Sequence, residues 1–154
     1  MLYHTSPEKI EKVSKFSGLF ESFLCFSSKP YWLGGKRPDF TYEIDETSLN
    51  ICQAGHIFYD ENSTDNKELQ SIVEEVMERC GVDEATAEGL IEESVNEWTE
   101  IDGCDADMSW WLQLQTAKAA RALGYDGCQM TDEQGSVYFI DMYKKENLWT
   151  ISEK

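Results

Sequence analysis

Apolar residues recur at helical spacing through the middle of the chain, whereas they gather in short runs toward its two ends. Between residues 69 and 80 the apolar positions share one side of a helix, and the pattern stops at Gly81. This spacing predicts a helix with one buried side that ends at the glycine. The stripe consists of Leu69, Ile72, Val73, Val76, Met77 and Cys80.

Two further helices are predicted after this one. Asp83 can cap the first of them, whose apolar side spans residues 87–98. Ser109 or Asp107 can cap the second, which covers residues 110–123 and is followed by a glycine. The outer sides of the first two helices carry most of the acidic residues of this region, and a solvated surface is the simplest interpretation of that pattern.

Short apolar or alternating runs near both ends of the chain predict strands. They cover residues 1–4, 23–26, 40–44, 137–142 and 148–151. Ser6 and Pro7 have the pattern of a helix start, and that helix would continue to about Val13. Strands, a helical middle section and further strands favour an α+β fold. The length of 154 residues predicts one domain over residues 1–154.

The charge of the chain limits the classes of partner that it is expected to bind. Thirteen Lys and Arg residues against thirty Asp and Glu residues give a formal net charge of −17. Such a field repels nucleic acid and anionic lipid and attracts basic surfaces. Two interpretations stay open: the acidity serves solubility, or the protein docks on a basic surface such as a nucleic-acid-binding groove. In either case no direct contact with nucleic acid is expected.

Several classes of protein are disfavoured by what the sequence lacks. No apolar stretch of about 18 residues and no signal-peptide pattern is present, so neither a membrane nor secretion is expected and the predicted location is the cytoplasm. Five cysteines occur without a C-x-x-C pair, which indicates free thiols and no metal site. Phosphate-binding loops, dinucleotide fingerprints, zinc-protease motifs and serine-hydrolase elbows are all absent.

The two ends of the chain carry the candidate chemistry. Residues 2–7 read Leu-Tyr-His-Thr-Ser-Pro, a short strand that ends in small hydrogen-bonding side chains. Residues 124–142 predict a strand, an acidic turn at Asp132 and Glu133, and a second strand. If the two segments lie side by side, the polar cluster faces a carboxylate across one cleft. A bond that develops positive charge could break there. On residue types alone, a structural histidine and ordinary turn acids remain the alternatives.

Several segments together resemble the anti-CRISPR ADP-ribosyltransferase family, whose phage-encoded members inhibit the type I-F CRISPR surveillance complex. The similarity extends over most of the chain, and the segments that carry it are residues 4–7, 23–26, 54–55, 57–59, 116–120 and 132–135. It implies a split α+β fold in which two small antiparallel or mixed sheets surround a cleft for NAD. It also implies transfer of ADP-ribose to a protein side chain near the site that reads target DNA, inside the bacterial host cell.

The resemblance implies roles for particular residues. NAD is a consumed co-substrate whose bond from ribose to nicotinamide breaks with oxocarbenium-like charge, which a carboxylate can stabilise. Asp132 is the first candidate for that carboxylate and Glu133 the alternative, because adjacent residues of an extended chain point to opposite faces. His4 would bind the adenosine-side ribose, with Thr5 or Ser6 near the nicotinamide amide or its ribose.

An aromatic ring is expected against the positively charged nicotinamide. Phe26 or Tyr31 would stack on it, and ordinary core packing is the alternative for both. The partner implied is the basic DNA-binding surface of a type I CRISPR effector complex. Two other functions stay open: a catalytically inactive acidic binding module that blocks the DNA groove, and a toxin-like transferase with another cytosolic target.

Overall fold

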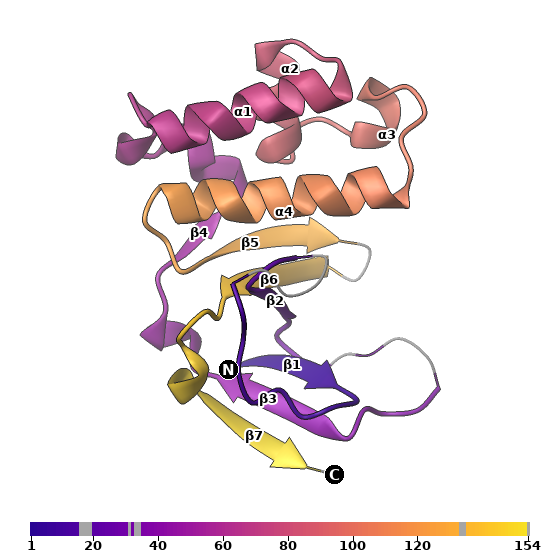
Figure 1. Cartoon of the computed structure of the whole chain (residues 1–154), viewed down its shortest axis with the longest axis vertical. Helices are drawn as coiled ribbons and strands as arrows, with labels where there is room; N and C mark the ends of the chain where they lie inside the picture. Colours follow the sequence, from indigo (N-terminus) through magenta and orange to yellow (C-terminus); the bar gives the residue numbers. More distant parts are fainter. Residues whose placement is uncertain (16–19, 31, 33–34, 133–134, 154) are drawn as a thin grey trace.

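Two sheets and a helical layer form the protein in a computed structural model that describes residues 1–15, 20–30, 32, 35–132 and 135–153 (Figure 1). Within these residues a three-stranded antiparallel sheet has the order β1-β3-β7, and a four-stranded mixed sheet has the order β2-β6-β5-β4. This arrangement confirms the predicted α+β class with two small sheets. The strands are β1 (Leu2–Ser6), β2 (Phe23–Phe26), β3 (Phe40–Ile44), β4 (Ile51–Gln53), β5 (Gly127–Asp132), β6 (Gly135–Asp141) and β7 (Trp149–Glu153).

The helices lie between the strands in sequence and cover one face of the four-stranded sheet. Figure 1 shows α4 directly over β5, with α1 and α2 beyond it. The α-helices are α1 (Lys67–Cys80), α2 (Glu84–Ile91), α3 (Glu97–Glu100) and α4 (Ala106–Ala122), and the short 3-10 helices are η1 (Glu46–Ser48), η2 (Ala54–Tyr59), η3 (Glu61–Ser63) and η4 (Glu146–Leu148). None of the helices in the described part of the chain is long and apolar enough to cross a bilayer.

Side-chain alternation along β2 and β6 explains why the molecule has two apolar cores. In β2, Phe23 packs among the helices, whereas Phe26 packs between the two sheets. Strand β6 divides in the same way, with Phe139 in the helical core and Ile140 in the core between the sheets. Because successive side chains of a strand point to opposite faces, one four-stranded sheet supplies a wall of both cores.

The two sheets are joined where β1 meets the end of β2. The Tyr3 amide donates to the Ser27 carbonyl at 2.8 Å, and the Ser27 amide donates back to Tyr3 at 2.9 Å. The first segment therefore does not pair with the acid-bearing strands. Strand β1 pairs with β3, and β2 lies between β1 and β6.

The predicted helix from Ser6 to Val13 is absent from the described structure of that segment. The Ser6 hydroxyl instead donates to the Glu8 carbonyl at 2.7 Å within a local bend. Beyond it the chain is held by distant partners: the Ile10 amide donates to the Tyr42 hydroxyl, and the Val13 amide donates to the Glu146 carboxylate. Tertiary contacts satisfy the backbone here, so the local helix-start signal is overridden.

The helical middle follows the predicted pattern with two differences. Helix α1 ends at Gly81, which adopts a left-handed conformation at φ 66°, and Asp83 caps α2 as expected. However, α2 ends at Ile91, and the predicted continuation is interrupted before α3 begins. The cap of α4 is Asp105, whose carboxylate accepts from the Met108 amide, so neither of the two caps proposed from the sequence is used.

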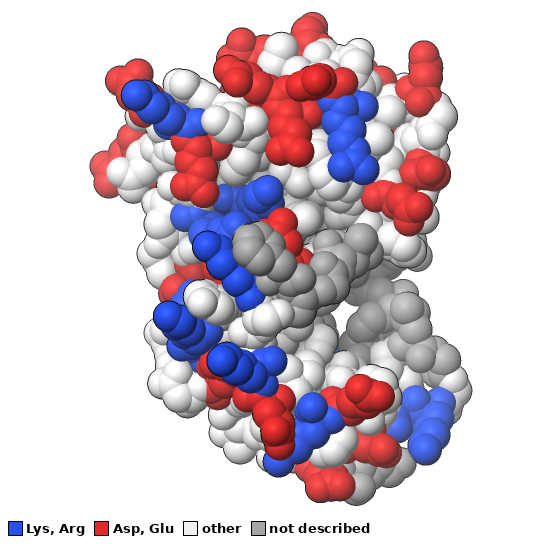
Figure 2. All heavy atoms as spheres, in the orientation of Figure 1, with Lys and Arg blue, Asp and Glu red and all other residues white. Residues whose placement is uncertain are grey.

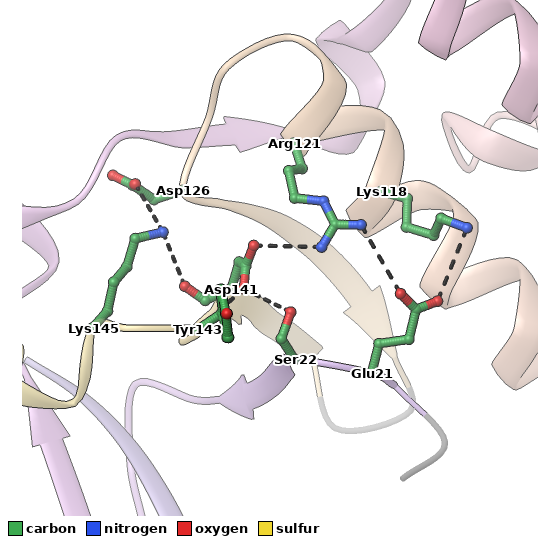
Figure 3. Close-up of polar contacts among 8 residues, drawn as sticks. All are labelled: Glu21, Ser22, Lys118, Arg121, Asp126, Asp141, Tyr143 and Lys145. Atoms are coloured by element: carbon green, nitrogen blue, oxygen red, sulfur yellow. Dashed lines mark hydrogen bonds and ion pairs between the residues drawn. The ribbon is translucent and has the colours of Figure 1, made fainter. Parts of the chain in front are cut away.

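A polar network fastens the end of α4 to the strands beneath it (Figure 3). Arg121 lies 3.4 Å from the Asp141 carboxylate and 4.0 Å from that of Glu21. Its guanidinium also sits 4.8 Å from the ring centre of Phe23. Asp141 in turn accepts from the Ser22 hydroxyl at 2.7 Å. The network thus ties α4, the start of β2 and the end of β6 together.

Candidate functional site

A cavity of about 550 Å³ lies at the junction of the two sheets. Its walls come from β1, from β2 and the turn that follows it, and from the start of β6. The described residues that line it are Tyr3, His4, Thr5, Pro7, Cys25, Ser27, Ser28, Lys29, Pro30, Trp32, Pro38, Ser136 and Val137. The volume is in the range of pockets that hold small molecules and cofactors.

His4 is held in one orientation by the strand next to its own sheet. Its ring nitrogen Nδ1 lies 2.8 Å from the carbonyl oxygen of Cys25, and a carbonyl can only accept, so Nδ1 carries the proton. The neutral ring therefore presents Nε2 as an acceptor. The rings of Phe26 and Tyr42 lie 5.7 Å and 5.8 Å from the imidazole and support it from the core.

The surroundings of His4 favour its neutral form. Burial lowers the pKa of the His4 imidazole below its usual value, although the hydrogen bond to the Cys25 carbonyl opposes this effect. A neutral imidazole with Nδ1 protonated can accept a hydrogen bond from a hydroxyl at Nε2. The arrangement suits a sugar hydroxyl better than it suits an anion.

The other N-terminal candidates divide between the cavity and its surroundings. Thr5 lines the cavity beside His4. The Ser6 hydroxyl is engaged with the Glu8 carbonyl, and Ser6 is not among the described lining residues. Phe26 is 0% exposed and packs in the core between the sheets. Stacking of its ring on a ligand would require an exposed face, so the core-packing alternative describes Phe26 in this structure.

One of the C-terminal candidates, Asp132, belongs to the hairpin whose second strand lines the cavity. Asp132 is the last residue of β5 and pairs with Gly135 across the hairpin. The two residues that follow Gly135 in β6, Ser136 and Val137, line the cavity. The side chain of Asp132 and all of Glu133 lie outside the described residues, as does the other aromatic candidate, Tyr31.

The turn after β2 supplies further lining residues that were not predicted from the sequence. Ser27, Ser28 and Lys29 add two hydroxyls and a cation to the cavity wall, and Trp32 adds an aromatic surface. The Ser27 hydroxyl donates to the Lys29 carbonyl at 2.5 Å and holds the turn in shape. The sequence signal that could have indicated these lining residues is a lysine between two serines and a proline, directly after the strand predicted at residues 23–26.

This combination of a split α+β fold and a junction cavity is the architecture expected of an ADP-ribosyltransferase. The family model for the anti-CRISPR type I-F ADP-ribosyltransferase AcrIF11 matches residues 39–146. The chain therefore belongs to this anti-CRISPR ADP-ribosyltransferase family, and the resemblance and enzyme class predicted from the sequence are confirmed. NAD is the co-substrate that this class of enzyme uses in general.

The fold comparison agrees with the family assignment. A solved chain described as the "Crystal structure of an anti-CRISPR protein" superimposes with a TM-score of 0.59 at 23% sequence identity. The match covers 99% of this chain and 93% of that chain, and at this identity it supports the fold alone. No significant match was found among curated proteins. The family match begins at residue 39, so it includes Asp132 and Glu133 and leaves out His4 and Thr5.

Proposed function

We propose that this protein, acting as one domain over residues 1–154, transfers ADP-ribose from NAD to a side chain of a type I CRISPR surveillance complex subunit. The modification would block target DNA binding in the host cytoplasm. The observation that carries the proposal is the cavity that β1 shares with the start of β6. A neutral, oriented His4 lines this cavity together with Ser136 and Val137 of the β5–β6 hairpin, and the same hairpin carries Asp132.

The reaction exchanges one bond at the ribose for another. The bond between the ribose C1′ and the nicotinamide nitrogen breaks, and neutral nicotinamide leaves with the bonding electron pair. An acceptor atom of the target side chain forms the new bond to C1′ and releases its proton to solvent. A carboxylate near C1′ lowers the barrier because it stabilises the positive charge that develops on the sugar. Asp132 is our first choice for this carboxylate, and Glu133 is the alternative.

The remaining roles follow from the chemistry of the lining residues. His4 accepts from a ribose hydroxyl through Nε2, and Thr5 lies beside it for the nicotinamide amide or its ribose. Ser6 stays a weaker candidate because its hydroxyl serves the bend at Glu8. Tyr31 is the aromatic that we propose against the nicotinamide, since Phe26 is enclosed in the core.

The acidic helices give the partner its proposed chemistry. Figure 2 shows acidic side chains predominating over the end of the molecule that α1 and α2 form. A complex that grips DNA presents Lys and Arg in its groove. Attraction between the two surfaces would bring the cavity to the acceptor side chain. The charge of −17 supports this docking, and its sign disfavours a direct contact with nucleic acid.

Transfer of label tests the proposal directly. The protein is incubated with NAD labelled in its adenylate part and a purified type I-F surveillance complex, and the subunits are separated and scanned for label. We expect one labelled subunit and loss of target DNA binding. Asp132→Asn or Glu133→Gln should lower transfer roughly a hundredfold or more while binding to the complex persists.

A matched substitution separates loss of chemistry from loss of charge. Glu153→Gln removes one exposed acid from β7, away from the acidic helices, and should leave transfer unchanged. Inhibition of DNA binding with no labelled subunit would instead support the inactive acidic binding module. Label on unrelated cytosolic proteins, with none on the complex, would support the toxin-like transferase.

A further inference from the structure

The last residues of β5 extend beyond their neighbour on one edge. Strand β5 lies between β6 and β4, and the short strand β4 ends with Gln53 opposite Gln129. The residues that follow, Met130 to Asp132, remain paired with β6 on the other edge. In the described structure no strand continues along the edge that β4 leaves. An unpaired backbone amide on this edge needs another acceptor.

Glu93 supplies that acceptor. Its carboxylate oxygens Oε1 and Oε2 lie 3.1 Å and 3.4 Å from the backbone nitrogen of Thr131, so the Thr131 amide donates to both. Glu93 follows the end of α2, and Thr131 directly precedes Asp132 in β5. A side chain from the helical layer thus replaces the missing strand at the residue before the proposed catalytic acid.

Glu93 holds a backbone conformation that a glutamate adopts only at an energetic cost. Glu93 has φ 64°, a left-handed conformation that glycine adopts at far lower cost than glutamate. The surrounding hydrogen bonds are those of a helix end that usually carries glycine, with the Ser94 amide donating to the Gly89 carbonyl at 2.9 Å. A glutamate at such a position sacrifices backbone stability and keeps a carboxylate against β5.

The hairpin is therefore bounded on two sides. Thr131 pairs with Ser136, and Ser136 lines the cavity of the proposed site. A second cavity, of about 560 Å³, lies on the side of the helices, and Glu93 and Thr131 are among the residues that line it. The strand end that leads to Asp132 runs between these two cavities, and the exposed Thr131 gains little support there from packing.

We infer that Glu93 is a positioning residue for the transferase reaction. By holding Thr131 it fixes the end of β5, and with it the carboxylate of Asp132 or Glu133. The inference rests on the proposed function, since it takes Asp132 or Glu133 as the reacting carboxylate. Reaction rates depend steeply on such placement, and an error of about 1 Å can cost on the order of a hundredfold. Glu93 itself need not touch NAD or the acceptor.

Glycine and glutamine at position 93 separate positioning from general stability. Glu93→Gly removes the acceptor and relaxes the left-handed backbone, so the melting temperature should stay equal or rise. The kcat for labelled ADP-ribose transfer to a type I-F surveillance complex should still fall about tenfold or more, with KM for NAD within about twofold. Glu93→Gln keeps an acceptor oxygen and should retain at least a third of the kcat, roughly.

Asp65→Gly is the matched control for this change. Asp65 also has a left-handed backbone, at φ 57°, and it lies just before α1, away from β5 in sequence and in pairing. The substitution removes one carboxylate and relaxes one strained residue, and transfer should not change. Equal kcat for Glu93→Gly and Asp65→Gly, together with inactive Asp132→Asn or Glu133→Gln, would overturn the role of Glu93 alone.

Amide hydrogen exchange gives a readout that does not depend on activity. The Thr131 amide should exchange slowly in the natural protein and in Glu93→Gln, and quickly in Glu93→Gly. Unchanged protection of Thr131 in Glu93→Gly would overturn the inference even if kcat fell. Full transfer by both Asp132→Asn and Glu133→Gln would overturn the proposed site, and the positioning role would fall with it.

Discussion

The imidazole of His4 and the carbonyl of Cys25 join the two sheets at the cavity, with 2.8 Å between Nδ1 and the oxygen. His4 belongs to the three-stranded sheet and Cys25 to the four-stranded sheet. This hydrogen bond fixes the tautomer of a site residue and, together with the Tyr3–Ser27 backbone pair, the relative placement of the two walls. A change that breaks this bond should therefore disturb the chemistry of the site and the junction of the sheets together.

The partly buried His4 makes the free energy of unfolding depend on pH in a defined direction. Burial lowers the pKa of His4 in the folded protein, so below about pH 6.5 the unfolded chain binds a proton that the folded protein does not. The stabilising contribution of the neutral His4 ring is therefore complete above that pH, and it is lost progressively as the pH falls from there through the lower pKa of the folded protein. Urea unfolding of the natural protein and of His4→Gln at about pH 7.5 and 5 measures the difference.

NMR titration of the His4 ring checks this prediction directly. A His4 pKa at or above about 6.5, the ordinary value for histidine, would contradict the prediction.

Gly127 is required by a close approach between β5 and β6. A Cβ built there would lie 2.5 Å from the Phe139 carbonyl oxygen and 3.0 Å from the Ile140 Cα, both backbone atoms. Gly127→Ala should therefore lower the free energy of unfolding by about 3 kcal/mol or more, or prevent folding. Gly55→Ala is the control, because nothing lies within 4 Å of a Cβ at that position. Thermal and urea unfolding measure both, and equal stability of the two variants would contradict the structure.

The parts of the fold set by local spacing were predictable from the sequence. The stripe from Leu69 to Cys80 and the glycine after it correspond to α1 almost residue for residue. The hairpin of β5 and β6 was also expected, because its acidic turn separates two strand patterns. The cap of α4 was harder to predict, because two aspartates lie at the start of this helix. Asp105 precedes the helix and accepts from an amide of its first turn, whereas Asp107 lies within that turn.

Contacts between distant segments were not predictable. Nothing near Ser6 shows that the amides of Ile10 and Val13 will find acceptors on Tyr42 and Glu146, so a helix start was the natural prediction. The three-residue strand β4 carries too few positions for a periodic signal. The same limit applies to the site: residue types suggested His4, but its place in the cavity depends on contacts that link β1 to β6 through β2.

The Arg121 network should contribute more to stability than the neighbouring Lys118–Glu21 ion pair. Arg121 forms an ion pair with Asp141 (Figure 3). Its guanidinium also stacks over Phe23, and all three groups are partly or fully buried. Arg121→Ala should cost about 1–2 kcal/mol, because stacking and the Asp141 contact are lost together. Lys118→Ala removes the ion pair in which Lys118 Nζ lies 3.9 Å from Glu21 Oε2, and it should lower the free energy of unfolding by under about 0.5 kcal/mol. Urea unfolding ranks them, and the reverse order would contradict this account.

Salt dependence tests the docking of the acidic helices on a basic partner. Steering between exposed charges weakens as ionic strength rises, so the association rate with a type I-F surveillance complex should fall about tenfold between about 0.05 M and 0.5 M salt.

Charge reversal to lysine at three exposed acids of α1, Glu74, Glu75 and Glu78, should lower the association rate further at low salt. The same net change at exposed Glu8, Glu11 and Glu153 is the control and should have a smaller effect, because these residues lie away from α1. Stopped-flow or surface-binding kinetics measure each rate. Equal rates for the two triple variants, or rates that do not respond to salt, would show that association does not depend on the helical acids.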